Sequence, residues 1–241
     1  MPIEEHDTVA THEPEGFWRL GRADRLGLVV DGENWFPAFA DLVEQAQRQV
    51  LILCWDVDSR VVMRRPCDSQ QAPCHLTAVL HRALEQNPGL TIHLLPWDFA
   101  MIYAFEREWL PLFSRPMTRH PRLRVRFDGE HPLGASQHQK LLVADDRVAL
   151  VGGFDPSRWR WDHRDHVPDD PVRHDPDGAP YPPFHDLAFA LTGPICHDLG
   201  ELARERWQRA TGERIAPPSN AVGETPRSEE HTSELQSLLI I

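Results

Sequence analysis

Short apolar runs alternate with longer amphipathic stretches along most of the chain. Runs bounded by Gly, Pro, Asp or Asn are typical of β-strands, and near-continuous apolar character is typical of strands buried on both faces. The strands that this pattern predicts are residues 26–30, 50–55, 90–95, 122–127, 138–143, 147–151 and 186–191. Apolar positions at helical spacing predict helices at residues 35–49, 75–86, 98–113 and 195–210.

The order of these elements predicts the fold class. Strands that alternate with helices form α/β layers, so we expect a layered sandwich in which a mixed, mostly parallel β-sheet is flanked by helices. The 241 residues are enough for one hydrophobic core. The predicted parts are a polar N-terminal arm (1–24), one domain (25–215) with an acidic, His-rich insertion (156–185), and a linker (216–226).

Residues 227–241 do not follow this pattern. They read Arg-Ser-Glu-Glu-His-Thr-Ser-Glu-Leu-Gln-Ser-Leu-Leu-Ile-Ile, which resembles a translated sequencing-adapter oligonucleotide. We therefore expect this tail to be non-native, with a genuine disordered tail as the alternative, and we exclude it from the predicted fold.

Charge and hydropathy narrow the classes of function. The formal net charge of −12 argues against general binding of nucleic acid, which requires cations that displace the counterions of phosphates. No apolar run is long enough to span a bilayer, and the N-terminus has neither the basic start nor the apolar stretch of a secretory signal. We expect a cytoplasmic protein. The arginines between residues 115 and 126 leave open either a peripheral contact with a membrane or a solvated strand face.

The four cysteines, Cys54, Cys67, Cys74 and Cys196, form no CxxC pair. This spacing favours free, mostly buried thiols. A disulfide or a metal clip that joins Cys67 and Cys74 is the alternative.

One segment combines residue types that phosphate chemistry uses. His138 and Lys140 are two residues apart in a predicted strand, so their side chains project from the same face. A neutral imidazole is a nucleophile, and an ammonium neutralises a phosphate oxygen. Lys140 is also the only lysine of the chain, which hints at a position that needs a compact cation. Asp145 follows at the predicted bend, within reach of backbone amides, and Gly152-Gly153 ends the return strand, where the backbone can approach a bound group.

The spacing H-x-K-x-x-x-x-D followed by the glycine pair resembles the HKD motif of the phospholipase D superfamily. The resemblance continues at Gly152-Gly153-Phe154-Asp155, Trp161-Asp162, Pro183-Phe184-His185-Asp186, Leu191-Thr192-Gly193-Pro194 and Trp207. This order is similar to the first, N-terminal motif half of plant-type and related bacterial phospholipases D. Many members carry Asn at the position of Asp155. The plant-type first motif carries an aspartate there, as this chain does.

This resemblance implies a two-step displacement at a phosphodiester. His138 would attack phosphorus and form a phosphohistidine while Lys140 stabilises the phosphate oxygens, and the scheme requires no cofactor and no metal. It also implies that Asp186 orients the histidine ring, with an ordinary strand-edge aspartate as the alternative. The implied catalytic residues are His138, Lys140, Asp145 and Asp186. The implied substrate-binding residues are Gly152, Gly153 and Asp155.

A second histidine, from a second H-x-K motif, would protonate the leaving alcohol, and residues 1–241 contain only one such motif. We expect the second half in a missing C-terminal region, with a homodimer partner as the alternative. The sequence therefore predicts a phospholipase D-type phosphodiesterase that hydrolyses or transfers the phosphatidyl group of glycerophospholipids, here as an incomplete fragment with little activity alone. A family nuclease and a catalytically inactive fragment are the two alternatives.

The insertion holds His163, His166, His174 and His185 among many aspartates. A metal site would pair His163 and His166 with carboxylates for zinc, or group the aspartates for calcium. The spacing matches no established metal-binding loop. We therefore expect no metal, and a solvated acidic loop at the entrance of the site.

Overall fold

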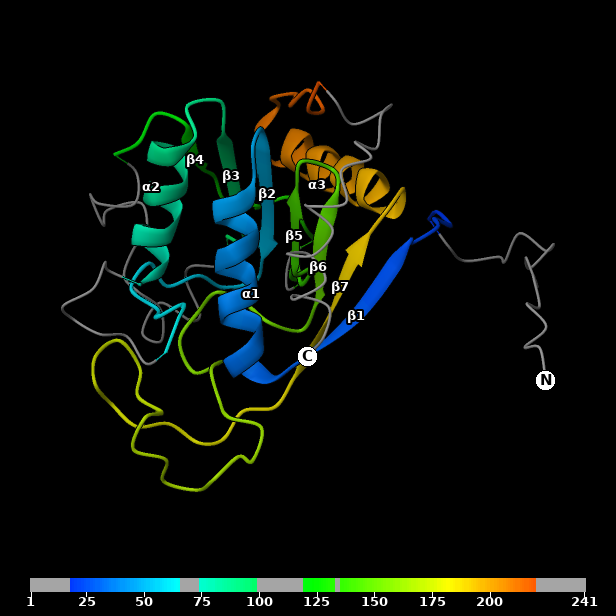
Figure 1. Cartoon of the computed structure of the whole chain (residues 1–241). Helices are drawn as coiled ribbons and strands as arrows, with labels where there is room; N and C mark the ends of the chain where they lie inside the picture. The colour runs from blue at the N-terminus through cyan, green and yellow to red at the C-terminus, as the bar shows by residue number, and fades with distance from the viewer. Residues whose placement is uncertain (1–17, 66–73, 99–118, 133–134, 220–241) are drawn as a thin grey trace, which may run out of the picture.

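A seven-stranded sheet forms the centre of the molecule (Figure 1). The computed structural model describes residues 18–65, 74–98, 119–132 and 135–219. The strands are β1 (Arg25–Val30), β2 (Gln49–Cys54), β3 (Thr91–Pro96), β4 (Leu123–Val125), β5 (Leu141–Ala144), β6 (Val148–Gly152) and β7 (Leu187–Thr192). They lie side by side in the order β1-β7-β6-β5-β2-β3-β4.

The sheet is mixed, as predicted, but most of its strand pairs are antiparallel. The pairs β2–β3 and β3–β4 are parallel, whereas β1–β7, β7–β6, β6–β5 and β5–β2 are antiparallel. The expectation of a mostly parallel sheet is therefore wrong. The tight turn between β5 and β6, where Asp145 and Asp146 both have a φ of 54°, accounts for one of these pairs, because so short a connection can join only antiparallel neighbours.

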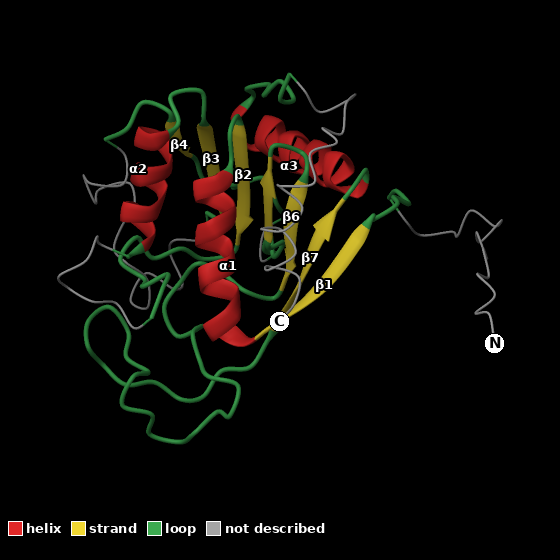
Figure 2. Ribbon diagram, viewed as in Figure 1, coloured by secondary structure: helices red, strands yellow, loops and turns green. Residues whose placement is uncertain are grey.

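Helices cover both faces of this sheet (Figure 2). They are α1 (Asp31–Gln45), α2 (Leu76–Gln86) and α3 (Ile195–Thr211). α1 and α2 lie on one face, and α3 lies on the other. Successive strand side chains point to opposite faces, so Leu142 packs in the core beneath α1 and α2, while Leu141 packs with Trp207 of α3. The predicted α/β sandwich is confirmed.

Two element boundaries differ from the prediction at positions near the motif. α1 begins at Asp31 and not at residue 35. The insertion crosses the helix start at Gly32, where a Cβ would lie 2.5 Å from the Cα of Trp161. β5 begins only at Leu141, so His138 and Lys140 precede the strand. The helix predicted at 98–113 lies, from residue 99 on, outside the described residues.

The insertion is a packed unit, and the expectation of a solvated loop is wrong for its interior. Asp162 is fully buried and accepts hydrogen bonds from the Arg173 guanidinium (2.7 Å) and from the amide of Phe184 (2.9 Å). Arg173, also buried, donates to the carbonyl groups of Tyr181 and Val167. A buried carboxylate is tolerated when every oxygen is matched by a donor, so internal ion pairing takes the place of hydration here.

The cysteines divide into two kinds. Cys54 and Cys196 are free and buried, as expected. Cys74 is disulfide-bonded, so the expectation of free thiols is wrong for this residue. Cys67 lies outside the described residues. Sequence spacing alone does not reveal whether two Cβ atoms come within bonding range, which is what a disulfide requires.

None of the helices in the described part of the chain combines the length and the apolar character that crossing a bilayer requires.

Candidate active site

His138 and Lys140 lie just before β5, at the end of the sheet where β6 finishes and β7 starts. The carbonyl oxygen of Lys140 accepts a hydrogen bond from the amide of Gly152 (3.3 Å), which extends the β5–β6 pairing by one residue. The imidazole of His138 is exposed and meets the ring of Trp55 edge-on, with 5.9 Å between ring centroids. The Lys140 ammonium lies 3.4 Å from the backbone carbonyl oxygen of His138. The predicted pair therefore lies together.

The charge state of His138 suits a nucleophile. Partial burial lowers the pKa of His138 below its usual 6.5, and the positive charge of Lys140 lowers the pKa further. Both effects disfavour the imidazolium. The ring is therefore neutral near pH 7, with a lone pair available for attack.

Lys140 is held by a buried carboxylate. Its side chain is 6% exposed, and its Nζ lies 3.4 Å from Oδ2 of Asp155, which is 1% exposed. The other oxygen of Asp155 accepts hydrogen bonds from the amides of Trp55 (2.7 Å) and Asp56 (3.3 Å). Burial raises the pKa of Asp155, and the Lys140 charge opposes that rise. The structure thus places the predicted substrate-binding residue Asp155 as the counter-ion of Lys140.

Gly152 and Gly153 lie in close contact with neighbouring groups. A Cβ on Gly152 would lie 2.5 Å from the Cα of Ala188, and a Cβ on Gly153 would lie 2.0 Å from a carboxylate oxygen of Asp186. The backbone of β7 excludes a side chain at Gly152, whereas a side chain at Gly153 would require the Asp186 carboxylate to move. Asp186 accepts a hydrogen bond from the amide of Leu187 (2.7 Å), and the described residues show none between Asp186 and His138. Its role in orienting the ring stays a prediction.

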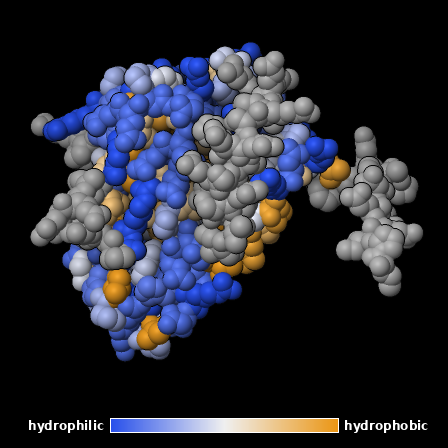
Figure 3. All heavy atoms as spheres, viewed as in Figure 1, coloured by the Kyte–Doolittle hydropathy of each residue, from blue (hydrophilic) through white to orange (hydrophobic). Residues whose placement is uncertain are grey.

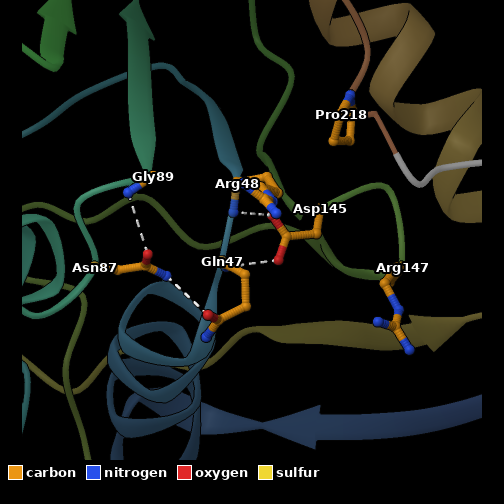
Figure 4. A pocket seen from close by; sticks show the side chains of 7 residues that line it. All are labelled: Gln47, Arg48, Asn87, Gly89, Asp145, Arg147 and Pro218. Atoms are coloured by element: carbon orange, nitrogen blue, oxygen red, sulfur yellow. Dashed lines mark hydrogen bonds between the residues drawn. The ribbon is translucent and has the colours of Figure 1, made fainter. Parts of the chain in front are cut away.

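Asp145 does not join this group. Its carboxylate accepts hydrogen bonds from the amides of Gln47 (2.7 Å), Arg48 (2.7 Å) and Gln49 (2.8 Å), where α1 leads into β2. Figure 4 shows the carboxylate directed at the first two of these amides. Seven residues, at about 3.3 Å each when extended, separate it from His138, roughly 23 Å in all. The position of Asp145 therefore supports a structural role.

Sequence reasoning missed Arg160. Its positive charge lowers the pKa of both His138 and Asp155, and its guanidinium lies 5.1 Å from the ring centroid of Phe184. It precedes the Trp161-Asp162 pair within the stretch that carries the resemblance. That position was the only available signal, because an arginine in a loop is usually a solvated surface residue.

One group of described side chains could hold a metal ion. Asp31, His166 and His185 each offer a ligand atom, and these atoms all lie within 4.8 Å of one another. His163, the other histidine considered from sequence, contacts Glu33 and Asp170 instead. The expectation that the insertion binds no metal stays a prediction. The grouping itself has no signal in the sequence, because folding brings Asp31 to the insertion from a distant part of the chain.

Comparison with known proteins gives the following matches. No family model matches the chain. It is 27% identical over 213 residues to phospholipase D zeta 1 of Arabidopsis thaliana, covering 75% of this chain and 19% of that protein. It is also 27% identical over 201 residues to phospholipase D2 of Bos taurus, covering 82% of this chain and 20% of that protein. The chain thus spans about a fifth of the length of these relatives.

Two solved structures share the fold. The phospholipase D family member Nuc from Salmonella typhimurium superposes with a TM-score of 0.50 at 12% identity, covering 79% of this chain and 99% of that one. Phosphatidylserine synthase from Haemophilus influenzae gives a TM-score of 0.50 at 13% identity, covering 90% of this chain and 43% of that one. The sequence matches to phospholipases D and this shared fold together relate the chain to the phospholipase D superfamily.

Proposed function

We propose that this chain is one motif half of a phospholipase D-type phosphodiesterase, with His138 as the nucleophile. The observation that carries the proposal is the exposed imidazole, whose pKa is lowered, beside the buried ammonium of Lys140. An uncharged nucleophile next to a fixed cation is the arrangement that attack on an anionic phosphodiester requires.

In the proposed reaction, a ring nitrogen of His138 attacks phosphorus. The bond from phosphorus to the leaving alcohol breaks, and a phosphohistidine forms. Lys140 balances the charge on the phosphate oxygens, and Arg160 adds a second positive charge near the site. Water or another alcohol then attacks phosphorus, which releases the phosphoryl group and restores the neutral imidazole.

A leaving alcohol of ordinary basicity needs a proton, and the general acid is proposed to come from a second H-x-K half. The sequence holds one such motif. A region beyond this chain is the preferred source, and a second copy of the chain is the alternative. On its own, the chain should therefore turn over natural diesters poorly.

The proposed substrate class is glycerophospholipid. The sequence matches are to proteins named phospholipase D, and the formal charge of −12 opposes general association with nucleic acid. Nuclease activity is an outcome that the test below distinguishes.

The test uses diesters with a p-nitrophenolate leaving group, because this group departs without a general acid. Phosphatidyl-p-nitrophenol in vesicles and a thymidine p-nitrophenyl phosphodiester are incubated with the chain, and covalent adducts are mapped by mass spectrometry. We expect a lipid-derived phosphoryl adduct on His138. It should be absent from His138→Ala, strongly reduced in Lys140→Met, and unchanged in the control His174→Ala.

Three outcomes would contradict the proposal. An adduct that survives His138→Ala would exclude this residue as the nucleophile. A nucleotide-derived adduct without a lipid-derived one would exclude a phospholipid substrate. A folded chain that forms no adduct with either diester would identify it as inactive.

A further inference from the structure

A second group of reactive side chains lies where the insertion packs on the start of α1. Figure 1 shows the loops of the insertion gathered below this helix end. Asp31 is the first residue of α1, His166 lies within the insertion, and His185 lies just before β7. Their ligand atoms are within 4.8 Å of one another. Folding thus brings a carboxylate from the start of α1 together with two imidazoles from the middle and the end of the insertion.

Asp31 is unusual in both its backbone and its side chain. It has a φ of 62°, a left-handed conformation that is unfavourable for a residue other than glycine. It is 1% exposed, and its Oδ1 lies 2.6 Å from Nδ1 of His185. Its Oδ2 is buried and has no hydrogen-bond partner among the described residues. A buried anionic oxygen without a donor is costly, so Oδ2 is a strong candidate for coordinating a cation.

His166 presents a nitrogen to this oxygen. Its Nδ1 lies 3.0 Å from Oδ2 of the buried Asp162, so Nδ1 carries the proton and donates it to that carboxylate. Its Nε2 lies 3.5 Å from Oδ2 of Asp31. In the neutral ring, two lone pairs face each other across this gap. A carboxylate that fixes the far nitrogen of a histidine is the usual outer partner of a metal-bound imidazole.

The distance between His166 and Asp31 matches the edge of a tetrahedral site. With metal–ligand bonds of about 2.0–2.1 Å, the edge of a tetrahedron is about 3.3–3.4 Å, close to the 3.5 Å between His166 and Asp31. The ring of His185 is 62% exposed, which leaves one side of the group open for a water ligand. The direct contact between His185 and Asp31 would open when the ion enters.

We infer that Asp31, His166 and His185 bind a divalent first-row transition ion, Zn²⁺ by preference, with Asp162 orienting His166. Two imidazole nitrogens and one carboxylate oxygen suit zinc and its neighbours, whereas calcium takes six to eight oxygen ligands. The ion would tie the middle and the end of the insertion to the start of α1. This inference does not depend on the proposed phosphodiesterase function.

The test is a metal titration of the full chain after removal of metal with a chelator. We expect calorimetry to give one Zn²⁺ per chain. The affinity should fall roughly tenfold or more in His166→Gln and in His185→Gln, and it should be unchanged in His163→Gln. His163→Gln is a matched control because His163 lies in the same insertion between two carboxylates, Glu33 and Asp170. Bound Co²⁺ should show the visible absorption of a nitrogen-ligated tetrahedral ion.

The variant His185→Gln distinguishes loss of metal binding from loss of folding, because the His185 ring is exposed. His185→Gln should keep the far-ultraviolet circular dichroism of the native chain while losing the rise in melting temperature that Zn²⁺ causes. The inference is overturned if no stoichiometric Zn²⁺ binds, if Ca²⁺ binds more tightly than Zn²⁺, or if His163→Gln weakens binding as much as His166→Gln.

Discussion

At the scale of single residues, the candidate active site depends on the balance of charge around His138. The ammonium of Lys140 lowers the pKa of the imidazole, and the carboxylate of Asp155 raises it. Asp155 is buried beneath Lys140 and anchored by two backbone amides. The same carboxylate therefore orients the ammonium and limits how far its charge shifts the imidazole.

This balance predicts opposite pH shifts for two variants. Asp155→Asn removes the negative charge, so the pKa of His138 should fall. In the pH profile of the rate of adduct formation, the decline on the acid side should then move to lower pH. Lys140→Met removes the positive charge, so this decline should move to higher pH while the rate drops. Stopped-flow release of p-nitrophenolate measures both. Asp145→Asn is the control, and an equal shift in that variant would refute the local origin of the effect.

A separate prediction concerns Asp145, which carries three hydrogen bonds to backbone amides far from His138. Asp145→Ala should lower the free energy of unfolding by roughly 2 kcal/mol, because charge-assisted bonds to the chain are lost. Urea denaturation measures this change, with the exposed Asp165→Ala as control. The amount of His138 adduct per folded chain should stay unchanged, and its loss would assign Asp145 a catalytic role.

At the scale of elements, α3 docks on the sheet through a buried histidine and an ion pair. His93 on β3 is 5% exposed and meets the ring of Trp207 edge-on at 4.9 Å. Arg204 of α3 forms two hydrogen bonds, of 2.9 and 2.8 Å, with the carboxylate of Asp146 in the β5–β6 turn. Burial lowers the pKa of His93 to about 4, so this interface accepts the neutral ring only.

The His93 pKa predicts a loss of stability in acid. The unfolded chain protonates His93 near its usual pKa of 6.5, while the folded chain resists protonation until about pH 4. The unfolded state therefore binds more protons in this window, and the free energy of unfolding should fall by roughly 3 kcal/mol as the pH drops through it. Urea unfolding between pH 7 and pH 4 checks this. His93→Phe should flatten the dependence, and an unchanged slope in this variant would contradict the assignment.

At the scale of the whole molecule, the chain matches about a fifth of its phospholipase D relatives and contains one H-x-K motif. Leu26 and Leu28 of β1 and Leu187 and Phe189 of β7 are exposed on the sheet edge. Figure 3 shows the apolar band that runs along this edge. Exposed apolar surface of this kind is typical of contact sites, which agrees with the proposal that a second half completes the site.

We therefore predict that natural phosphatidylcholine is turned over only when a second H-x-K half is supplied. The chain should release little choline at any protein concentration, and co-expression with the native downstream region should restore release. Phe189→Ser should weaken association with that region in sedimentation experiments, with the exposed Val172→Ser as control. Specific activity that rises with the concentration of this chain alone would instead establish a homodimer.

Much of the fold and part of the site were predictable from local patterns. The described strands and helices follow from apolar spacing and differ from the prediction at boundaries such as the start of α1. The helix predicted at 98–113 stays a prediction. The proximity of the Lys140 ammonium to His138 was predictable because the two residues are only two apart in the chain. Asp155 was identified as a site residue, but its pairing with Lys140 was not predictable, because it depends on how the two segments pack.

The sequence by itself determined the α/β order, the turn between β5 and β6 and the imidazole–ammonium pair, since each depends on interactions between near neighbours in the chain. Only the tertiary structure decided that most strand pairs are antiparallel, that Asp145 lies far from His138, and that Asp31 joins His166 and His185. These features depend on contacts between residues far apart in sequence. Local propensity carries no information about such contacts, which packing and the pairing of buried charges select.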